Sequence, residues 1–370
     1  MNQNKRNINI FRVIFKAGIL FILFNFAFVF VKSESLGKLS LYNRIFPGRE
    51  RFPFGETRAS YNISLYNLEA MFASHIIAGV DKAPDEYRVI LIGDSSVWGT
   101  LLTPEQTLAG QLNANPISAC GKNVRVYNLG YPTISLTKDL MLFDQAMQYQ
   151  PDLVILLTTL EAFPVDKQFV SPLVANNADR IRELISRYNL SAYENDSALI
   201  QPSTLEQTFV SRRRSLADLL RLQVDGALWA STGVDQVYPE DYEHAQVDLD
   251  ADVEYHDMTE PSALRDALAM DVFDAMMSVA PAPMLLVNEP MLISDGANSD
   301  IRYNFFYPRW AFDEYRKIIQ EYADQHDSHY IDLWDLVPAS EFTNSAIHLT
   351  PYGESLLADK VAENIKNTCK

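Results

Sequence analysis

Cysteine is nearly absent from this sequence, and basic residues are in the minority. Of 370 residues, 2 are cysteines, and 48 acidic residues outnumber 31 Lys and Arg to give a net charge of −17. Neither Cys120 nor Cys369 lies at zinc-ligand spacing from another cysteine or a histidine, so no metal site is indicated. The acidic balance argues against nucleic acid or an anionic membrane surface as the main partner. Pairing of the two cysteines stays open, although an oxidising compartment would permit it.

Internal repeats are also absent, and only one long apolar run occurs. Residues 17–31 read AGILFILFNFAFVFV. The run spans about 30 Å of hydrocarbon if it begins at Ile10, with Arg12 and Lys16 extending towards the headgroups. No A-x-A-like cleavage site follows it. The pattern favours an uncleaved signal anchor over a cleaved signal peptide or a buried helix, with a cytoplasmic tail and anchor at residues 1–34 and an extracytoplasmic main domain.

Short apolar runs alternate with helical patterns through most of the chain. The runs lie at residues 87–92, 124–129, 153–158, 283–287 and 330–333. Apolar residues at helical spacing lie between and after them, at 104–112, 135–149, 311–326 and 351–366. Strands that are apolar throughout and separated by helices are typical of a parallel sheet covered on both faces. We therefore predict a three-layer α/β/α sandwich over residues 86–370, preceded by an irregular connecting segment at 35–85.

The interval 160–282 interrupts this alternation. It contains helical patterns at 178–188 and 205–222, followed by an acidic tract at 235–260. The tract includes DLDADVEYHD, but it lacks the glycine and the terminal glutamate of an EF-hand, so we interpret it as a solvated loop. The whole interval is predicted to be an insertion beside the sheet.

Three short sequences with candidate catalytic residues fall where predicted strands end or where the last helix begins. They are GDS at 93–95, NLG at 128–130 and AIHLT at 346–350. Sites in open parallel sheets form at the carboxyl ends of the strands. A serine nucleophile needs a base within hydrogen-bond reach, and a histidine on a neighbouring loop supplies one. Each residue also has a purely structural interpretation: Ser95 as a helix cap, Gly130 as a turn glycine and His348 as a neighbour of the final helix cap.

Taken in this order, the three sequences resemble the signature blocks of the SGNH hydrolases, also called the GDSL family. The resemblance covers about residues 87–160 and 283–366. It implies an α/β/α sandwich that needs no cofactor, with Ser95 as the nucleophile and His348 as the general base. It also implies that the backbone N–H groups of Ser95 and Gly130 hold the oxyanion. The apolar run adds a narrower likeness to membrane-anchored family members that handle acyl groups on cell-envelope polymers.

The sequence departs from the family pattern beside the histidine. The aspartate normally found three residues earlier is replaced by Ser345, with Asn344 one step further. Asn344 would hold the imidazole but would stabilise its protonated form less, and loss of the orienting carboxylate costs up to about 10⁴ in turnover. The alternative orienting groups are Asp332, Asp335, Glu341 and a backbone carbonyl.

A second departure falls in the block normally written G-x-N-D, whose asparagine aligns with Glu161. An ionised glutamate would repel an oxyanion. Either Glu161 turns away and the hydroxyl of Thr158 or Thr159 donates instead, or this third donor is absent. Thr159 is the donor that we predict.

Polar residues after the fourth predicted strand form a candidate substrate-binding group. Asn288 and Glu289 end the strand, and Arg302 follows in a polar loop, where its guanidinium would suit an acidic or sugar ligand. A solvated loop explains these residues equally well. The aromatic stretch at 307–310 is interpreted as packing rather than as a substrate platform.

The sequence therefore predicts a serine ester hydrolase acting on acyl esters, with O-acetyl groups first, on an acylated carbohydrate or a small ester. Acyl transfer to an envelope polysaccharide shares the first half-reaction and stays an alternative, with a membrane acyltransferase as a candidate partner. The other alternative is a binding protein on a degraded hydrolase fold, which the residues Ser345 and Glu161 favour.

Overall fold

The fold is built on one six-stranded sheet with the strand order β2-β3-β1-β4-β5-β6. The computed structural model describes residues 9–31, 48–54, 67–190, 193–194, 196–199, 202–232, 241–279 and 282–368. The strands are β1 (Glu86–Ile92), β2 (Ser118–Ala119), β3 (Lys122–Asn128), β4 (Leu153–Thr158), β5 (Met284–Asn288) and β6 (His329–Asp332). All neighbouring pairs are parallel except β2 and β3. From β1 the chain builds the sheet first towards β3 and then, from β4 onwards, in the opposite direction. The boundary between β1 and β4 is therefore the topological switch point, where open sheets of this kind bind ligands.

The five predicted strands are confirmed, and the sixth corrects the expectation of a wholly parallel sheet. β2 is an antiparallel edge strand of 2 residues. It is joined to β3 by Cys120 and Gly121, whose φ angles are 50° and 75°. Two successive residues in the left-handed region are typical of the tight turn that closes a β-hairpin. A strand this short leaves no periodic pattern in the sequence.

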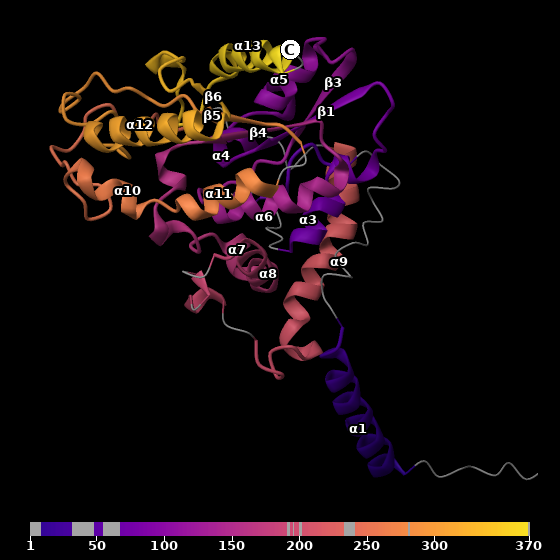
Figure 1. Ribbon diagram of the computed structural model, residues 1–370. Helices are drawn as coiled ribbons and strands as arrows, with labels where there is room; N and C mark the ends of the chain where they lie inside the picture. The colour runs from indigo at the N-terminus through magenta and orange to yellow at the C-terminus, as the bar shows by residue number, and fades with distance from the viewer. Residues whose placement is uncertain are drawn as a thin grey trace, which may run out of the picture.

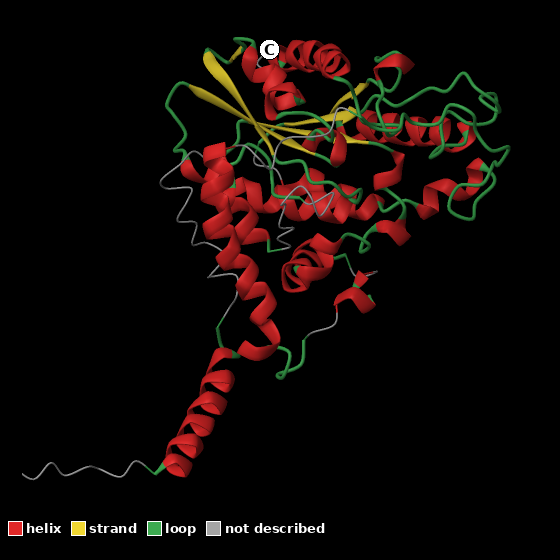
Figure 2. Cartoon of the chain, turned by 180° about the vertical axis from the view of Figure 1, so that it is seen from behind, coloured by secondary structure: helices red, strands yellow, loops and turns green. Residues whose placement is uncertain are grey.

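Apolar side chains alternate across the sheet and meet helices on both sides. In β1, Val89 and Leu91 face one core, while Ile90 and Ile92 face the other. The first core is covered by α5 (Leu108–Ala114) and α13 (Pro351–Asn367), and the second by α6 (Leu136–Ala146), α11 (Met270–Val279) and α12 (Arg309–His326). Figure 1 shows the two layers, and Figure 2 shows the sheet between them from behind. The predicted three-layer architecture is confirmed.

Two helices begin later than predicted, each after a short turn. The pattern at 104–112 divides into a 3-10 turn (Pro104–Gln106) and α5, since Thr107 accepts a hydrogen bond from Gly110 N–H at 3.2 Å and caps a new helix. The pattern at 205–222 shifts to α9 (Phe209–Thr232). Residues before it form turns, closed by Thr208 N–H donating to the carbonyl of Leu205 at 3.2 Å.

Six further α-helices are present among the described residues, of which α8 and α1 are the longer ones. They are α3 (Leu68–Ser74), α4 (Ser95–Trp98), α7 (Pro172–Asn176), α8 (Ala178–Tyr188), α10 (Leu264–Ala267) and α1 (Ile10–Phe28). The predicted helix at 178–188 coincides with α8. Within the predicted insertion at 160–282, α7 and α8 lie below α6 in Figure 1 and α9 rises along the side of the domain, whereas α11 belongs to the layer that covers the sheet.

Residues 48–54 and 67–77 of the 35–85 segment are largely packed into the core, which the sequence did not indicate, whereas residues 78–85 are mostly exposed. The guanidinium of Arg51 donates to the carbonyls of Gly99 and Leu102 at 2.9 and 3.0 Å, and it lies 4.3 Å from the ring centroid of Trp98. The Trp98 indole N–H donates to the carbonyl of Phe52 at 2.9 Å. The segment therefore clamps the end of α4, the helix that begins at Ser95.

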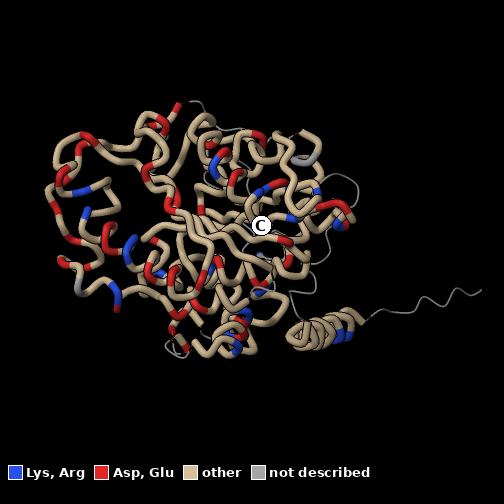
Figure 3. Tube along the Cα trace, turned by 45° about the horizontal axis from the view of Figure 1, so that its top comes forward, with Lys and Arg blue, Asp and Glu red and all other residues tan. Residues whose placement is uncertain are grey.

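The acidic tract is exposed along most of its described length, and its backbone is tied to neighbouring loops. Ala245 N–H donates to the carbonyl of Thr343 at 2.8 Å, and Leu249 N–H donates to that of Ala297 at 2.9 Å. The tract thus runs beside the loops at the carboxyl edge of the sheet. Figure 3 shows how acidic residues are spread over this domain.

Helix α1 projects away from the domain (Figure 1), and its side chains are almost all exposed. Among the described residues, it is the one helix long and apolar enough to cross a membrane, with 19 residues and a mean hydropathy of 2.0. Cys120, between β2 and β3, is disulfide-bonded. The other cysteine, Cys369, lies outside the described residues.

Candidate active site

The turn after β1 places Ser95 at the carboxyl edge of the sheet. A Cβ atom at Gly93 would lie 2.5 Å from Val97 Cγ2 and 2.8 Å from the carbonyl oxygen of Leu157, so only glycine fits between α4 and β4. Asp94 Oδ1 accepts the N–H of Ser96 at 2.8 Å and starts α4. Ser95 is therefore the first residue of α4, and its side chain is only half-buried.

The structure brings together the three residues predicted to form a catalytic triad. Ser95 Oγ lies 2.8 Å from Nε2 of His348, across 253 positions of sequence. Nδ1 of the same imidazole lies 2.8 Å from Oδ1 of Asn344. Because an amide oxygen can only accept, Nδ1 carries the proton, and Nε2 is free to accept the serine proton. This is the tautomer that a general base requires.

The loop carrying His348 is held by backbone hydrogen bonds on both sides. Thr343 N–H donates to the carbonyl of His348 at 2.8 Å, and Thr350 N–H donates to that of Glu341 at 2.9 Å. Leu292 N–H, from the segment after β5, donates to the carbonyl of Ala346 at 2.7 Å. The imidazole is thus positioned by a narrow hairpin rather than by a free loop.

Two of the alternative orienting groups, Asp332 and Glu341, contact other residues. Asp332 accepts hydrogen bonds from Asn288 and Arg316, each at 2.8 Å. The carboxylate of Glu341 accepts the hydroxyl of Thr350, the cap of α13. Asn344 therefore occupies the place of the orienting carboxylate in this structure.

Desolvation lowers the pKa of His348 from its usual value to about 4. The neutral imidazole is the form that accepts a proton, so we expect the kcat/KM for ester cleavage to rise as the pH increases through about 4. It should then stay level up to neutral pH, where an ordinary histidine would still be titrating. A pH profile with a chromogenic acetate ester checks this, and an acid limb centred at pH 6.5 or above would contradict it.

Gly130 is in the predicted place, but its N–H is not free. The amide donates to Asn128 Oδ1 at 3.0 Å, and the Asn128 side chain also donates to the carbonyl of Val97 at 2.7 Å. A Cβ atom at Gly130 would lie 2.6 Å from the backbone nitrogen of Trp98. The turn closed by Asn128 thus packs Gly130 against α4, which corrects the prediction that this N–H is available to an oxyanion.

Thr159 is likewise turned away from the role predicted for it. Its side chain is fully buried, and its hydroxyl lies 3.1 Å from the hydroxyl of Tyr307. The Tyr307 hydroxyl also accepts the N–H of Glu161 at 3.3 Å. Tyr307 is itself buried, as the packing interpretation of the aromatic stretch predicted. Of the three predicted oxyanion donors, the structure leaves the N–H of Ser95 without a described partner.

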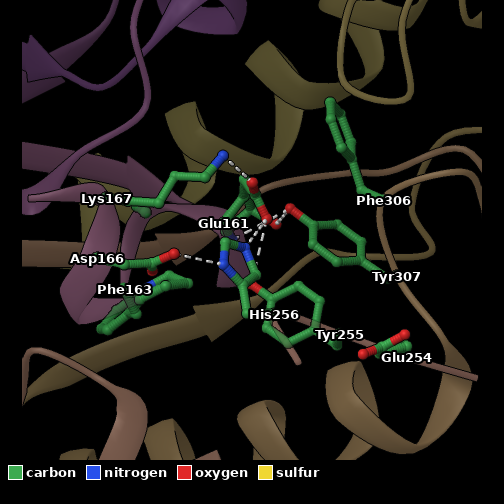
Figure 4. A network of polar contacts seen from close by, with 12 residues as sticks. Glu161, Phe163, Asp166, Lys167, Glu254, Tyr255, His256, Phe306 and Tyr307 are labelled. Atoms are coloured by element: carbon green, nitrogen blue, oxygen red, sulfur yellow. Dashed lines mark hydrogen bonds and ion pairs between the residues drawn. The ribbon is translucent and has the colours of Figure 1, made fainter. Parts of the chain in front are cut away.

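Glu161 is turned into a polar network of its own, which Figure 4 shows. One carboxylate oxygen is paired with the ammonium of Lys167, and the other accepts the hydroxyl of Tyr255 at 3.2 Å and lies 3.5 Å from His256 Nε2. Nδ1 of His256 lies 3.0 Å from a carboxylate oxygen of Asp166. Burial alone raises the pKa of Glu161, but the hydrogen bonds from His256 and Lys167 hold it below its usual range. These partners neutralise the carboxylate that would otherwise repel an oxyanion.

The three predicted substrate-binding residues are buried and bonded within the protein. Asn288 donates to Asp332, and Glu289 accepts the hydroxyl of Ser96. The guanidinium of Arg302 donates to backbone carbonyls, including those of Asn304 at 3.2 Å and Asp252 at 2.9 Å. Arg302 fastens the acidic tract to the loop after β5, which corrects its predicted role as a ligand-gripping residue.

A buried ion pair lies beneath the nucleophile turn. The ammonium of Lys138 in α6 lies 2.7 Å from Asp139 Oδ1 and donates to the carbonyl of Gly93 at 2.7 Å. Burial raises the pKa of Asp139 to about 6 and that of Asp94 above its usual range. Sequence reasoning missed this pair, although two adjacent charges inside an apolar helix are the signal that would have revealed it.

Replacing Lys138 with Met should lower the free energy of unfolding by about 3–5 kcal/mol, because it leaves buried carboxylates without their cation. Chemical denaturation of the purified chain measures the change. The matched control is Lys317→Met at an exposed position of α12, which should shift stability by no more than about 0.5 kcal/mol. Equal stability of the two variants would contradict this account of Lys138.

A cavity of about 10 Å³ lies below Ser96, between Glu289 and Glu354. It has room for about one water molecule, so it is no substrate pocket. Burial and the Asp94 carboxylate raise the pKa of Glu289 well above its usual range, and burial raises that of Glu354 to about 8. The cavity is therefore part of the buried packing around the turn that carries Ser95.

Several solved structures are similar to this chain. An aryl esterase from M. smegmatis shares 13% identity at a TM-score of 0.34, over 76% of this chain and 98% of that one. A carbohydrate acetylesterase from Sinorhizobium meliloti shares 12% identity at a TM-score of 0.33, over 75% of this chain and 97% of that one. A putative lipolytic protein of the G-D-S-L family from Desulfitobacterium hafniense shares 12% identity at a TM-score of 0.31, over 75% of this chain and 98% of that one. No family model and no curated protein matches the sequence.

Proposed function

We propose that this chain is a serine ester hydrolase that works through an acyl-serine intermediate at Ser95. The contact of 2.8 Å between Ser95 Oγ and Nε2 of His348 carries the proposal. Its support is the second contact, from Nδ1 of the imidazole to Asn344, which selects the productive tautomer.

The reaction proceeds in two halves. His348 takes the proton of Ser95 Oγ as the oxygen attacks the acyl carbonyl, and then returns it to the departing alcohol oxygen. Water attacks the acyl-serine in the second half, and His348 again takes and returns the proton, releasing the carboxylic acid and free Ser95. The N–H of Ser95 is the proposed donor to the oxyanion, and a second donor would be gained if Asn128 released the N–H of Gly130.

The proposed substrates are O-acetyl esters of a carbohydrate, or small acetate esters. This follows from the resemblance of the motifs together with an N-terminal helix that can span a membrane. Anchored by α1, with its main domain outside the cytoplasm, the protein would meet acylated envelope polymers. The disulfide at Cys120 supports an oxidising compartment.

Acetate release from acetylated xylan, and from a chromogenic acetate ester, tests the proposed activity. We expect both substrates to release acetate in water. Acetate that appears on an added sugar hydroxyl, and not in solution, would mean that the chain is an acyltransferase instead, working with a membrane acyltransferase as donor partner.

A second candidate is a binding protein on the same fold. Two observations favour it, namely the N–H of Gly130 bonded to Asn128 and the hydroxyl of Thr159 beside Tyr307, since both remove expected oxyanion donors. Binding of acetylated xylan oligosaccharides without any release of acetate would identify this function.

A further inference from the structure

Helices α1 and α9 meet at one place, although 180 residues of sequence separate them. The side-chain oxygen of Asn25, in α1, accepts the N–H of Val210 at 3.1 Å and so caps the first turn of α9. The ring of Phe209 lies 5.2 Å from that of Phe24 and 5.4 Å from that of Phe28, measured between centroids. Figures 1 and 2 both show α9 descending from the domain to the carboxyl end of α1.

This junction lies at the level where α1 would leave a bilayer. The 19 residues of α1 extend about 28 Å, close to the hydrocarbon thickness of about 30 Å. Asn25 precedes the end of the helix by three residues, which is about 4.5 Å along its axis. The first turn of α9 therefore reaches the interfacial layer of any membrane that α1 spans.

The residues exposed around this junction combine apolar and basic side chains. Phe30 is 87% exposed, Leu205 70% and Val210 42%, although water is an unfavourable neighbour for all three. Residues 212–214 are all arginine, and Glu206 is the one acidic residue between 203 and 214. Arg212 also donates to the carbonyl of Val31 at 3.1 Å, which joins the two helices again. In a chain with a net charge of −17, this stretch is locally basic.

We propose that these residues form a juxtamembrane surface that binds anionic phospholipid headgroups, its members being Phe30, Leu205, Val210 and the arginines at 212–214. The apolar side chains enter the interfacial layer, and the arginines bind phosphate above it. The surface holds α9, and with it the catalytic domain, in one orientation to the bilayer. The inference rests on the proposed anchoring by α1, and it does not depend on the esterase activity.

The test places a fluorescent label at single sites of the full chain in phosphatidylcholine vesicles containing phosphatidylglycerol and nitroxide lipids. Val210→Cys reports on the surface, and Phe21→Cys reports on insertion of α1. Val224→Cys is the matched control, because it is equally apolar, 72% exposed and about 21 Å further along α9. We expect headgroup-level nitroxide to quench the label at 210, deep nitroxide to quench that at 21, and neither to quench that at 224.

The role of charge is tested by adding Arg213→Gln or Arg214→Gln to the chain labelled at 210. Both substitutions keep the hydrogen bond from Arg212 to the carbonyl of Val31. Each lost arginine should weaken the lipid-bound state about fivefold, so quenching at 210 should fall.

The inference would be overturned if the label at 21 is quenched, which shows that α1 is inserted, but the label at 210 is not. Equal quenching at 210 and 224, or no effect of the charge changes, would also overturn it. Protection of the 210 label from aqueous iodide without lipid quenching would assign the surface to a protein. Without quenching at 21, the anchoring itself fails.

Discussion

Replacing Ser95 with alanine will lower kcat for cleavage of a chromogenic acetate ester by about 10⁴-fold or more. The hydroxyl is the atom that forms the acyl intermediate, and the remaining groups of a triad contribute little without their nucleophile. The N–H of residue 95 persists in the variant, so substrate binding and KM should change little. Steady-state kinetics on the purified full chain provide the measurement.

Ser340→Ala serves as the matched control for this variant. Ser340 is an exposed serine in the turn before the His348 loop, and its hydroxyl contacts only Glu341 among the described residues. It should retain the activity of the parent chain. Unchanged acetate release by the Ser95 variant would remove the nucleophile assignment, whatever the structure of the site.

Replacing Asn344 with aspartate should speed turnover. A carboxylate at this position would accept from Nδ1 of His348 as the amide now does at 2.8 Å, and it would also stabilise the protonated imidazole that forms during attack. The reverse change in a serine protease triad costs about 10⁴ in turnover, which sets the upper limit of the gain. The kcat of the two proteins on the same ester measures the effect.

The same substitution should move the acid limb of the pH profile upwards. A neighbouring negative charge raises the pKa of His348 from about 4, so a higher pH is needed to free the base. Asn344→Ala is the control, and it should lose activity because nothing then fixes the tautomer. A slower Asn344→Asp enzyme would indicate that the amide has a role of its own.

The strands and the turn that carries Ser95 could be predicted because each depends on local sequence. Continuous apolar runs mark buried parallel strands, and Gly93 marks a turn too tight for a side chain. The carboxyl ends of the strands then fall at one edge, and a late histidine beside that edge completes the pair. Asn344 lies one residue before the position where the family motif puts its orienting aspartate, and its side chain nevertheless reaches Nδ1 of His348 at 2.8 Å.

The predictions that failed concern groups whose hydrogen-bond partners are determined by the tertiary fold. Arg302 has the chemistry to bind a ligand, but backbone carbonyls of the acidic tract occupy its guanidinium. The N–H of Gly130 is occupied by a side chain only two residues away, yet nothing in NLG reveals the rotamer of Asn128. Glu161 turns away, as one of the two alternatives had it, and its partner His256 lies 95 residues later. Such pairings arise from the tertiary fold and leave no periodic signal.

Covalent labelling with a fluorophosphonate tests the central claim most directly, since the probe reacts with an activated serine and needs no knowledge of the substrate. After digestion, mass spectrometry of the labelled chain locates the adduct. We predict a single adduct on Ser95, lost in His348→Ala as well as in Ser95→Ala. A folded chain that stays unlabelled, or one labelled at another serine, would contradict the account.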